Sequence, residues 1–427
     1  MSAPERKPLV PRLRFPEFRE AGEWEVKPLS AIARITQGGT PCTSVSEYWG
    51  GSIQWVTPAE MGKEVSPYIS KTARAITAEG LRNCSSELLP PNSVILSTRA
   101  PIGHLAINSV SMAINQGCRG IVVKSDCSAK FVYFSLGFCR ARLESLGAGN
   151  TFKELSGNAL KSFTFPIPQK DEQQKIADCL SSLDDLIAAE TYKLDTLKTH
   201  KKGLMQQLFP REGELVPRVR FPEFREAGAW CEKPLSKVCN VLQGYGFPEV
   251  LQGKSEGKYP FCKVSDISRA VAEKGGVLDE ATNYVGDDEL LKLRAKPVPK
   301  GATVFAKIGE ALRLNRRAYV QKECLIDNNA TGLKAIDGIA DDYFVYLLSQ
   351  LIDLNRHCGG AVPSVNKTTL EEIEVVVPGL DEQKRIAENL SSLDDLITGQ
   401  SQKIDALKTH KKGLMQQLFP VLDEVGA

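Results

Sequence analysis

An internal duplication constrains this chain more strongly than any other feature of its sequence. The stretch PRLRFPEFREAGEWEVKPLS, which begins at Pro11, returns at Pro217 as PRVRFPEFREAGAWCEKPLS. A second stretch begins at Asp171 and returns at Asp381, with about 29 of 40 aligned residues identical. Because an internal repeat determines the architecture before any local pattern does, we expect one frame that is built twice.

The parts between the copied blocks, roughly residues 39–165 and 245–375, are almost unrelated in sequence. Drift after an old duplication, the alternative interpretation, would spread the differences along the whole repeat. Their concentration favours a division of labour between a copied frame and two variable domains. The predicted boundaries are a first variable domain at 1–168, a first spacer helix at 169–210, a second variable domain at 211–378 and a second spacer helix at 379–420.

The copied block at the end of each repeat predicts one long helix. In the first copy, apolar residues recur in alternating steps of four and three, which is a heptad pattern. They are Ile176, Leu180, Leu183, Ile187, Leu194, Leu197, Leu204 and Leu208. Glu190 and Lys201 interrupt this seam in the first copy, and Gln400 and Lys411 interrupt it in the second.

A seam this narrow predicts a single partner helix, and the other copy is the obvious candidate. Two like units related by an approximate two-fold axis would pair their helices antiparallel, with the variable domains at the two ends of a fixed spacer. We expect a register in which Glu190 meets Lys411 and Lys201 meets Gln400. A slip by one heptad would set these polar residues against leucines, at a desolvation cost.

The variable segments alternate short apolar runs with turn residues, which is typical of mixed α+β domains. Strands are expected at 94–97, 120–124, 163–167, 303–307, 318–321 and 373–377, with short helices near 130–146 and 341–355. The fold class predicted for the chain is therefore α+β. It comprises two mixed α/β domains separated by two long antiparallel helices in a pseudo-two-fold tandem repeat.

Polar and basic side chains on glycine-containing loops are the candidates for binding, because Arg, Lys, Asn and Gln hydrogen-bond to base edges and phosphates. In the first segment the candidates are Thr40, Tyr48, Trp49, Arg99, Asn115, Gln116, Asn150, Thr151 and Lys153. In the second segment they are Tyr245, Lys263, Arg313, Arg316, Arg317, Asn328, Asn329, Asn366 and Lys367. Such residues also line the loops of most globular proteins. Trp49 equally suits a core position, and Asn115 and Asn328, which follow apolar strands at similar places, equally suit a structural turn.

Several functional classes are disfavoured by what the sequence lacks. It contains no Asn-Pro-Pro-Phe/Tyr tetrapeptide of amino-methyltransferases, and Gly253-Lys254-Ser255 has Pro248 where a phosphate-binding loop needs glycine. The four histidines show no metal-ligand spacing. We therefore expect no catalytic residue, no metal and no cofactor.

Composition points to a cytoplasmic protein. The eleven cysteines are scattered without a Cys-x-x-Cys pair, which suits reduced thiols. No secretory signal is apparent, and no apolar run approaches the roughly 18 residues of a membrane span. The formal net charge is only +2, so any positive charge that binds DNA is local or is supplied partly by partners.

The layout resembles the specificity subunits of type I restriction–modification systems across essentially the whole chain. The copied motifs that carry the resemblance are Phe15, Trp24 and Leu29, with Phe221, Trp230 and Leu235, and the junctions Pro168, Glu172, Gln173 and Ile176, with Pro378, Glu382, Gln383 and Ile386. The first variable segment adds Gly38-Gly39-Thr40-Pro41, Tyr48-Trp49-Gly50-Gly51, Trp55, Arg99-Ala100-Pro101-Ile102-Gly103 and Asn115-Gln116-Gly117.

The resemblance implies a recognition subunit without activity of its own. Its two target-recognition domains would read the halves of an asymmetric, interrupted sequence in double-stranded DNA. It would recruit two adenine-N6 methyltransferase subunits, which carry S-adenosylmethionine, and ATP-driven restriction subunits. Two identical partners need two identical docking sites. We assign part of those sites to His200, Lys202, His410 and Lys412, for which a plain solvated helix face is the alternative.

Three other functions remain open from the sequence alone. The chain can be a DNA reader for a differently organised modification system, a coiled-coil adaptor whose globular domains bind proteins, or an enzyme with an unrecognised site. DNA binding that weakens steeply with salt separates the readers from the adaptor, because phosphate contacts release counterions.

Overall fold

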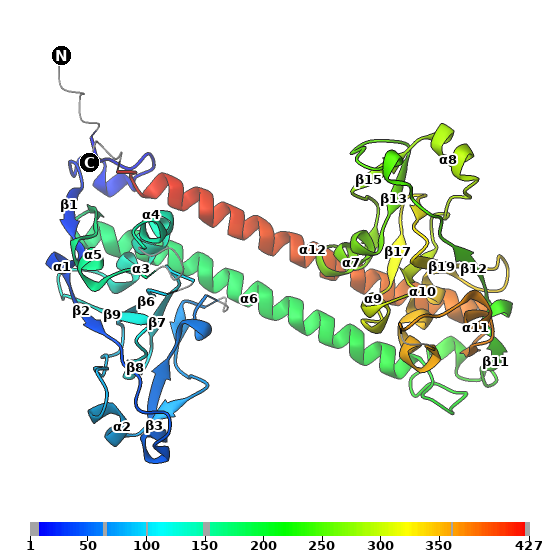
Figure 1. The fold of residues 1–427 in the computed structure, drawn as a ribbon, viewed down its shortest axis with the longest axis horizontal. Coiled ribbons are helices and arrows are strands. Elements are labelled where there is room, and N and C mark those ends of the chain that lie inside the picture. The colour runs from blue at the N-terminus through cyan, green and yellow to red at the C-terminus, as the bar shows by residue number, and fades with distance from the viewer. Residues whose placement is uncertain (1–7, 63–65, 100, 148–153, 360–361, 423–427) are drawn as a thin grey trace. The chain divides into compact units, whose positions relative to one another are not determined.

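The computed structural model describes residues 8–62, 66–99, 101–147, 154–359 and 362–422. The chain divides into two compact units, the first made of Met1–Tyr192 with Lys403–Ala427 and the second of Lys193–Gln402. Each unit therefore combines one variable domain with part of both long helices, α6 (Lys170–Leu208) and α12 (Leu380–Leu418) (Figure 1).

The first unit is built on three sheets. A five-stranded sheet has the order β2 (Ala33–Gln37), β9 (Cys118–Val123), β6 (Val94–Ser97), β7 (Leu105–Asn108) and β4 (Tyr68–Ile69). A three-stranded sheet has the order β5 (Ala75–Ile76), β3 (Trp49–Val56) and β8 (Met112–Ile114). An antiparallel pair joins β1 (Glu25–Pro28) to β10 (Thr164–Ile167), the strand that leads into α6. The short helices are α1 (Leu29–Ile32), α2 (Ala78–Arg82), α3 (Ala129–Phe138), α4 (Arg140–Ser145) and α5 (Gly157–Ser162).

The second unit repeats this topology with an unrelated variable sequence. Its five-stranded sheet has the order β12 (Cys239–Gln243), β19 (Ala330–Ala335), β16 (Thr303–Ala306), β17 (Ala318–Val320) and β14 (Val277–Leu278). Its smaller sheets join β15 (Asn283–Val285), β13 (Tyr259–Cys262) and β18 (Leu325–Ile326), and β11 (Cys231–Pro234) with β20 (Glu374–Val377). Its short helices are α7 (Val264–Glu273), α8 (Asp287–Leu293), α9 (Glu310–Arg313), α10 (Asp342–Leu351) and α11 (Lys367–Glu371).

The predicted fold class is confirmed, and the expected strands are present with ends shifted by a few residues. The helical stretch expected near 130–146 is divided at Cys139 into α3 and α4, and the one expected near 341–355 is α10. The α3 and α10 helices begin at matched caps, because Ser128 accepts the amide of Phe131 and Asp341 accepts the amides of Tyr343 and Phe344. None of the helices within the described ranges is long and apolar enough to cross a lipid bilayer. All eleven cysteines are free thiols.

The two copied motifs of each repeat meet in a buried ion pair. In the first unit, Arg14 donates two hydrogen bonds to Glu172, at 2.8 and 2.7 Å, and the side chains are only 6% and 1% exposed. The indole N–H of Trp24 donates to the same carboxylate. In the second unit, Arg220 and Glu382 repeat the pair.

Aromatic packing attaches the first copied stretch of each repeat, which begins at Pro11 or Pro217, to the end of a long helix. In the first unit Trp24 packs edge-on against Phe131 and Phe419. In the second unit Trp230 packs in the same way against Phe344 and Phe209. The repeated tryptophan and the repeated Leu-Phe-Pro ending of the helix are therefore required by the same core.

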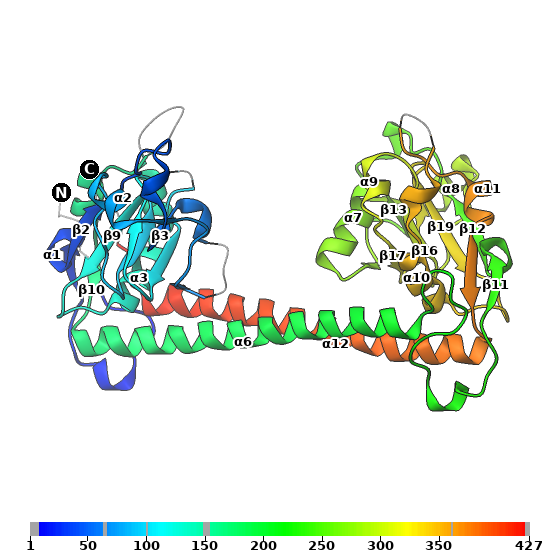
Figure 2. The ribbon, with the colours of Figure 1, turned by 90° about the horizontal axis from the view of Figure 1, so that it is seen from below.

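Ion pairs within each unit show how the long helices pair. In the first unit Asp184 binds Lys411, and Glu190 binds Lys403. Because the α6 number rises while the α12 number falls, the helices are antiparallel, as expected. The sheets of the first domain lie on one side of its helix segments (Figure 2).

The predicted register is wrong by one heptad. Lys411 binds Asp184 rather than Glu190, and in the second unit Lys201 binds Asp394. Packing agrees, because Leu418 joins the core cluster that contains Ile176. The desolvation argument failed because it considered only residues on the seam, whereas aspartates beside the seam supply the counter-charge to lysine side chains long enough to reach them.

Candidate nucleic-acid interface

A loop, a strand and a turn of the first domain meet at a close backbone contact. A Cβ atom at Gly38 would lie 1.8 Å from the carbonyl oxygen of Asn115, so only glycine fits there. The amide of Gly39 donates to the carbonyl of Ile114 at 2.9 Å. The indole N–H of Trp55 donates to the carbonyl of Gly39 at 2.9 Å. The glycine loop, strand β3 and the turn after β8 are therefore held as one cluster.

Thr40 and Gln116 lie at the surface of this loop cluster and are hydrogen-bonded to each other. Gln116 is exposed and Thr40 is half-buried. The side chain of Asn115 is turned inward, where its oxygen accepts the amide of Gly117 at 2.9 Å. Asn115 therefore stabilises the turn, and Gln116 is the residue that the turn presents at the surface.

Tyr48 and Trp49 are half-buried at the start of β3. The indole N–H of Trp49 donates to the carbonyl of Cys42 at 3.2 Å, and the ring packs edge-on against Trp55. One face of the Trp49 ring is covered by the guanidinium of Arg74, 3.6 Å from the ring centroid. Sequence reasoning missed Arg74 because only the fold brings it to Trp49.

Arg99 is exposed two residues after the end of β6 and forms an ion pair with Glu154, at 3.2 Å. The predicted residues Asn150, Thr151 and Lys153 lie outside the described residues.

The second domain builds the same scaffold from different side chains. A Cβ atom at Gly244 would lie 1.8 Å from the carbonyl oxygen of Asp327, as Gly38 does against Asn115. Tyr245 is half-buried, and its amide donates to the carbonyl of Ile326 at 2.9 Å. The structural counterpart of Asn115 is therefore Asp327, one residue before Asn328.

The turn after β18 places Asn328 and Asn329 at the surface, where both are exposed. The carboxylate of Asp327 accepts the amide of Asn329 at 3.1 Å. Burial raises the pKa of Asp327. By position, Asn328 corresponds to Gln116 as the side chain that the turn presents.

Lys263 lies beside an aromatic pair in this cluster. Its ammonium group is 5.6 Å from the ring centroid of Phe247 and donates to Gln252 at 2.6 Å. The Phe247 ring stacks on Phe261 with centroids 3.7 Å apart.

Of the three candidate arginines within residues 313–317, some lie at the surface and one is buried. Arg313 is exposed, 3.7 Å from Glu310, and Arg316 is half-buried. Arg317 is only 4% exposed, lies over Phe305 and donates to the side chain of Asn315. Burial lowers the pKa of its guanidinium to about 10. We therefore leave Arg317 out of the set proposed to contact DNA, because its side chain is enclosed by the domain.

The remaining candidates of the second domain lie at the start of α11. The Asn366 side chain caps this helix by accepting the amide of Thr369 at 2.8 Å, so it serves the local fold. Lys367 is exposed and lies 3.5 Å from Glu371.

The residues predicted to bind partner proteins are all exposed on the long helices. They are His200, Lys202, His410 and Lys412. The seam residues beside them, Lys201 and Lys411, are instead engaged in the ion pairs that join the helices.

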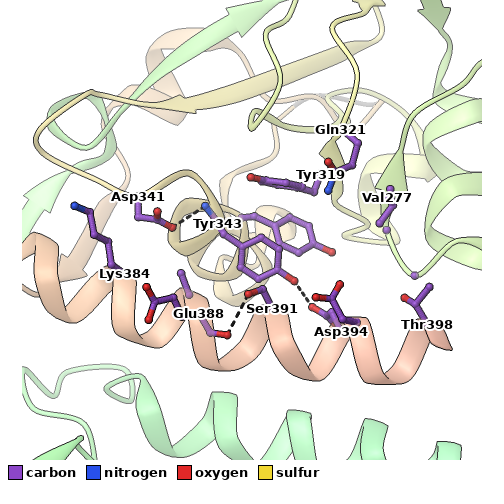
Figure 3. A pocket seen from close by; sticks show the side chains of 15 residues that line it. Val277, Tyr319, Gln321, Asp341, Tyr343, Lys384, Glu388, Ser391, Asp394 and Thr398 are labelled. Atoms are coloured by element: carbon purple, nitrogen blue, oxygen red, sulfur yellow. Dashed lines mark hydrogen bonds between the residues drawn. The ribbon is translucent and has the colours of Figure 1, made fainter. Parts of the chain in front are cut away.

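A pocket of about 490 Å³ lies in the second unit between the variable domain and α12 (Figure 3). Tyr319, Tyr343 and Tyr346 form its aromatic wall, with ring centroids 5.2–5.6 Å apart. Tyr343 donates its hydroxyl to Asp394, and burial raises the pKa of Tyr343. The carboxylates of Glu388 and Asp395 and the ammonium group of Lys384 also line it. It contains none of the predicted DNA-binding residues.

The described residues hold no cluster of His, Cys, Asp or Glu that suits a metal ion.

Comparison with known proteins assigns the chain to a family. Residues 21–199 and 228–409 match the family described as the type I restriction modification DNA specificity domain. The chain belongs to this family.

Named relatives within the specificity family match either nearly the whole chain or part of it. The chain is 27% identical to the type I restriction enzyme MjaIX specificity subunit of Methanocaldococcus jannaschii, over 94% of this chain and 95% of the relative. It is 30% identical to the EcoR124I/EcoR124II specificity subunit of Escherichia coli over 179 residues, 40% of this chain and 43% of the relative.

Solved structures share the fold of this specificity protein. The S subunit of a type I restriction–modification system from M. genitalium matches with a TM-score of 0.62 at 15% identity, covering 97% of this chain and 100% of that one. A chain from a structure described as concerning complex assembly of the type I R-M system matches with a TM-score of 0.54 at 15% identity, covering 93% and 97%.

Proposed function

We propose that this chain is the non-catalytic, DNA-reading subunit of a type I restriction–modification complex. In this proposal the recognition domains at 1–168 and 211–378 each read one half of an asymmetric, interrupted target in double-stranded DNA. The helices at 169–210 and 379–420 set the gap between the half-sites, in a cytoplasmic complex that also contains methyltransferase and restriction subunits. No cofactor is assigned to this chain.

The observation that carries the proposal is one scaffold with two different surfaces. Gly38 and Gly244 make the same backbone contact, and the turns that they touch present Gln116 in one domain and Asn328 in the other. A shared scaffold with different hydrogen-bonding side chains at its exposed positions suits two readers of different base sequences. A target made of two unlike half-sites follows.

Methylation mapping tests this proposal. The chain is co-expressed with the methyltransferase subunit of its own system in a host without other methylation, and methylated adenines are mapped across the genome. We expect one split, asymmetric motif that disappears when residues 39–165 or 245–375 are deleted. A stable protein complex without DNA binding at low salt would instead favour the protein-binding adaptor.

The pattern of identity between the long helices supports docking of two identical partners. Packing explains identity at buried positions, but Leu186 and Leu396 are 41% and 59% exposed and are identical. His200 and His410 are also exposed and identical. By contrast, all five residues at 188–192 differ from those at 398–402. The fold alone does not require the exposed identities.

The antiparallel pairing places these exposed, identical residues of α6 and α12 near each other in each unit. In the first unit Glu190 binds Lys403 across the seam. Leu186 lies one turn before Glu190, and His410 lies one heptad after Lys403. Residues at these spacings share a helix side, so Leu186 and His410 come to one level on the same side of the pair. We call this pair of positions the docking surface.

The duplication repeats the docking surface in the second unit, where Leu396 and His200 take the same places. The ion pair of Lys201 with Asp394 repeats that of Lys411 with Asp184. Two copies of one docking surface suit two copies of one partner protein. Each partner would offer an apolar recess that accepts the exposed leucine. We assign them to the two methyltransferase subunits.

Native mass spectrometry of the co-expressed complex tests the docking surface. We expect two methyltransferase copies with the wild-type chain, one with Leu186→Asp or Leu396→Asp alone, and none with both. Leu88→Asp is the matched control, because Leu88 is 46% exposed in a variable domain. Two copies retained by the double variant would exclude the docking surface.

A further inference from the structure

Arg74 lies on an aromatic stack at the loop cluster of the first domain. Its guanidinium carbon is 3.6 Å from the centroid of the Trp49 ring and 5.5 Å from that of Trp55. The two indoles meet edge-to-face, with centroids 5.2 Å apart and an interplanar angle of 85°. A guanidinium this close to an aromatic face is restrained in its plane by cation–π attraction.

The backbone on both sides of the stack is also fixed. The carbonyl of Arg74 accepts the amide of Trp55 at 3.3 Å and the hydroxyl of Thr72 at 2.7 Å. The indole N–H groups of Trp49 and Trp55 donate to the carbonyls of Cys42 and Gly39. The stack is therefore tied directly to the glycine loop that also carries Thr40.

Among the described arginines between residues 33 and 147, Arg74 differs from the others in what its side chain binds. Arg34, Arg82, Arg99 and Arg140 each form an ion pair with a carboxylate. Arg119 and Arg142 hydrogen-bond to backbone carbonyls. Arg74 is exposed, and among the residues that the structure describes its side chain has no hydrogen-bond acceptor or carboxylate partner. Its donors are available to a ligand.

The second domain builds a similar stack from an unrelated sequence. Phe261 occupies the place of Trp55, since the residue after each, Cys262 or Val56, accepts the amide of the matching turn. Phe247 stacks on Phe261, and Lys263 lies over Phe247. Both domains therefore place a cation on an aromatic pair beside the glycine loop.

We propose that Arg74 contacts the DNA of the first half-site by donating two hydrogen bonds to a pair of acceptors on the duplex. Trp49 is the positioning residue that holds the guanidinium plane. The inference rests on the proposed function and adds a contact to it. The acceptor pair is either O6 and N7 of a guanine or two oxygens of a phosphate, because both match the planar donors of arginine.

The test compares Arg74→Ala with Arg82→Ala in the complex co-expressed with the methyltransferase subunit. Arg82 is also an exposed arginine, but it pairs with Glu79. We expect Arg74→Ala to weaken binding of the wild-type target on the order of 10- to 100-fold, and Arg82→Ala to leave it unchanged. Arg74→Lys, which keeps the charge and loses the planar fork, should recover only part of the loss.

The acceptor is identified by two further readouts. If Arg74 contacts a guanine, the methylated motif of Arg74→Ala relaxes at one position of one half-site, and the other half-site is unchanged. If Arg74 contacts a phosphate, the methylated motif stays the same. The negative slope of log affinity against log salt concentration then becomes shallower by about 1.

The controls separate this inference from the proposed function. A wild-type complex without any methylated motif or DNA binding would reject the proposed function itself. A wild-type complex that methylates its motif, with Arg74→Ala indistinguishable from Arg82→Ala in motif, affinity and salt slope, would overturn the role of Arg74 alone. Thermal unfolding of the two variants should coincide, because both side chains are exposed.

Discussion

Arg14 provides the sharpest test of why both copied motifs recur. Its guanidinium holds both oxygens of Glu172 and also donates to the carbonyl of Gly22 at 2.6 Å. Replacing Arg14 with methionine keeps an unbranched side chain and removes the charge. The carboxylate of Glu172, 1% exposed, would then keep Trp24 as a hydrogen-bond donor but lose its counter-charge.

The expected loss of unfolding free energy in Arg14→Met follows from the burial of Glu172. Removing one partner of a buried ion pair typically costs about 3–5 kcal/mol, because the other charge stays buried without compensation. The pair of Arg34 with Glu87 is the control, since its side chains are 57% and 54% exposed. Arg34→Met should cost no more than about 1 kcal/mol.

Urea unfolding followed by hydrogen exchange measures both variants. We expect Arg14→Met to lower the unfolding free energy of the first unit and to leave exchange in the second unit unchanged. Arg14→Met combined with Glu172→Met should recover most of the loss, because no buried charge remains. A loss below about 1 kcal/mol for Arg14→Met would refute the structural role assigned to the copied arginine.

Two further predictions concern titratable groups. Burial raises the pKa of Asp327, so the ionisation of this carboxyl at neutral pH opposes folding. We therefore expect Asp327→Asn to be more stable than wild type at pH 7. The difference in stability should vanish below about pH 4, because the carboxyl is then protonated in the unfolded chain as well. Equal stability of the two proteins at pH 7 would contradict this. For the helix register, a double-mutant cycle of Asp184→Asn and Lys411→Met should give a coupling of about 1–3 kcal/mol, and the cycle of Glu190→Gln and Lys411→Met should give close to zero. The reverse ranking would restore the register expected from the seam.

The repeat made the architecture predictable from the sequence. Identity between the copies marked the frame, and heptad spacing identified α6 and α12. The approximate two-fold relation of the two copies predicted that these helices are antiparallel. The register was not predictable from the seam alone. Asp184 and Asp394 lie beside the seam, and their role appears only when the helices are set side by side.

The sequence pointed to loops, and the fold decides how their side chains are placed. The glycine-flanked turns singled out in the sequence are ones that the fold brings into close backbone contact at Gly38 and Gly244. Composition could not show that Asn115 and Asn366 serve their own backbone, or that Arg317 is buried. Arg74 was missed because its distinguishing feature, the contact with Trp49, depends on the pairing of β3 with β5.

The most direct test of the central claim is a methylation map of a chain with two copies of one reader. Residues 217–378 of the second variable domain are replaced by a copy of residues 11–168, and the chain is co-expressed with its methyltransferase subunit. If each domain reads one half-site, the methylated motif becomes two inverted copies of the first half-site with the original gap. Methylation that keeps the original asymmetric motif would contradict the claim that the two domains read the two halves.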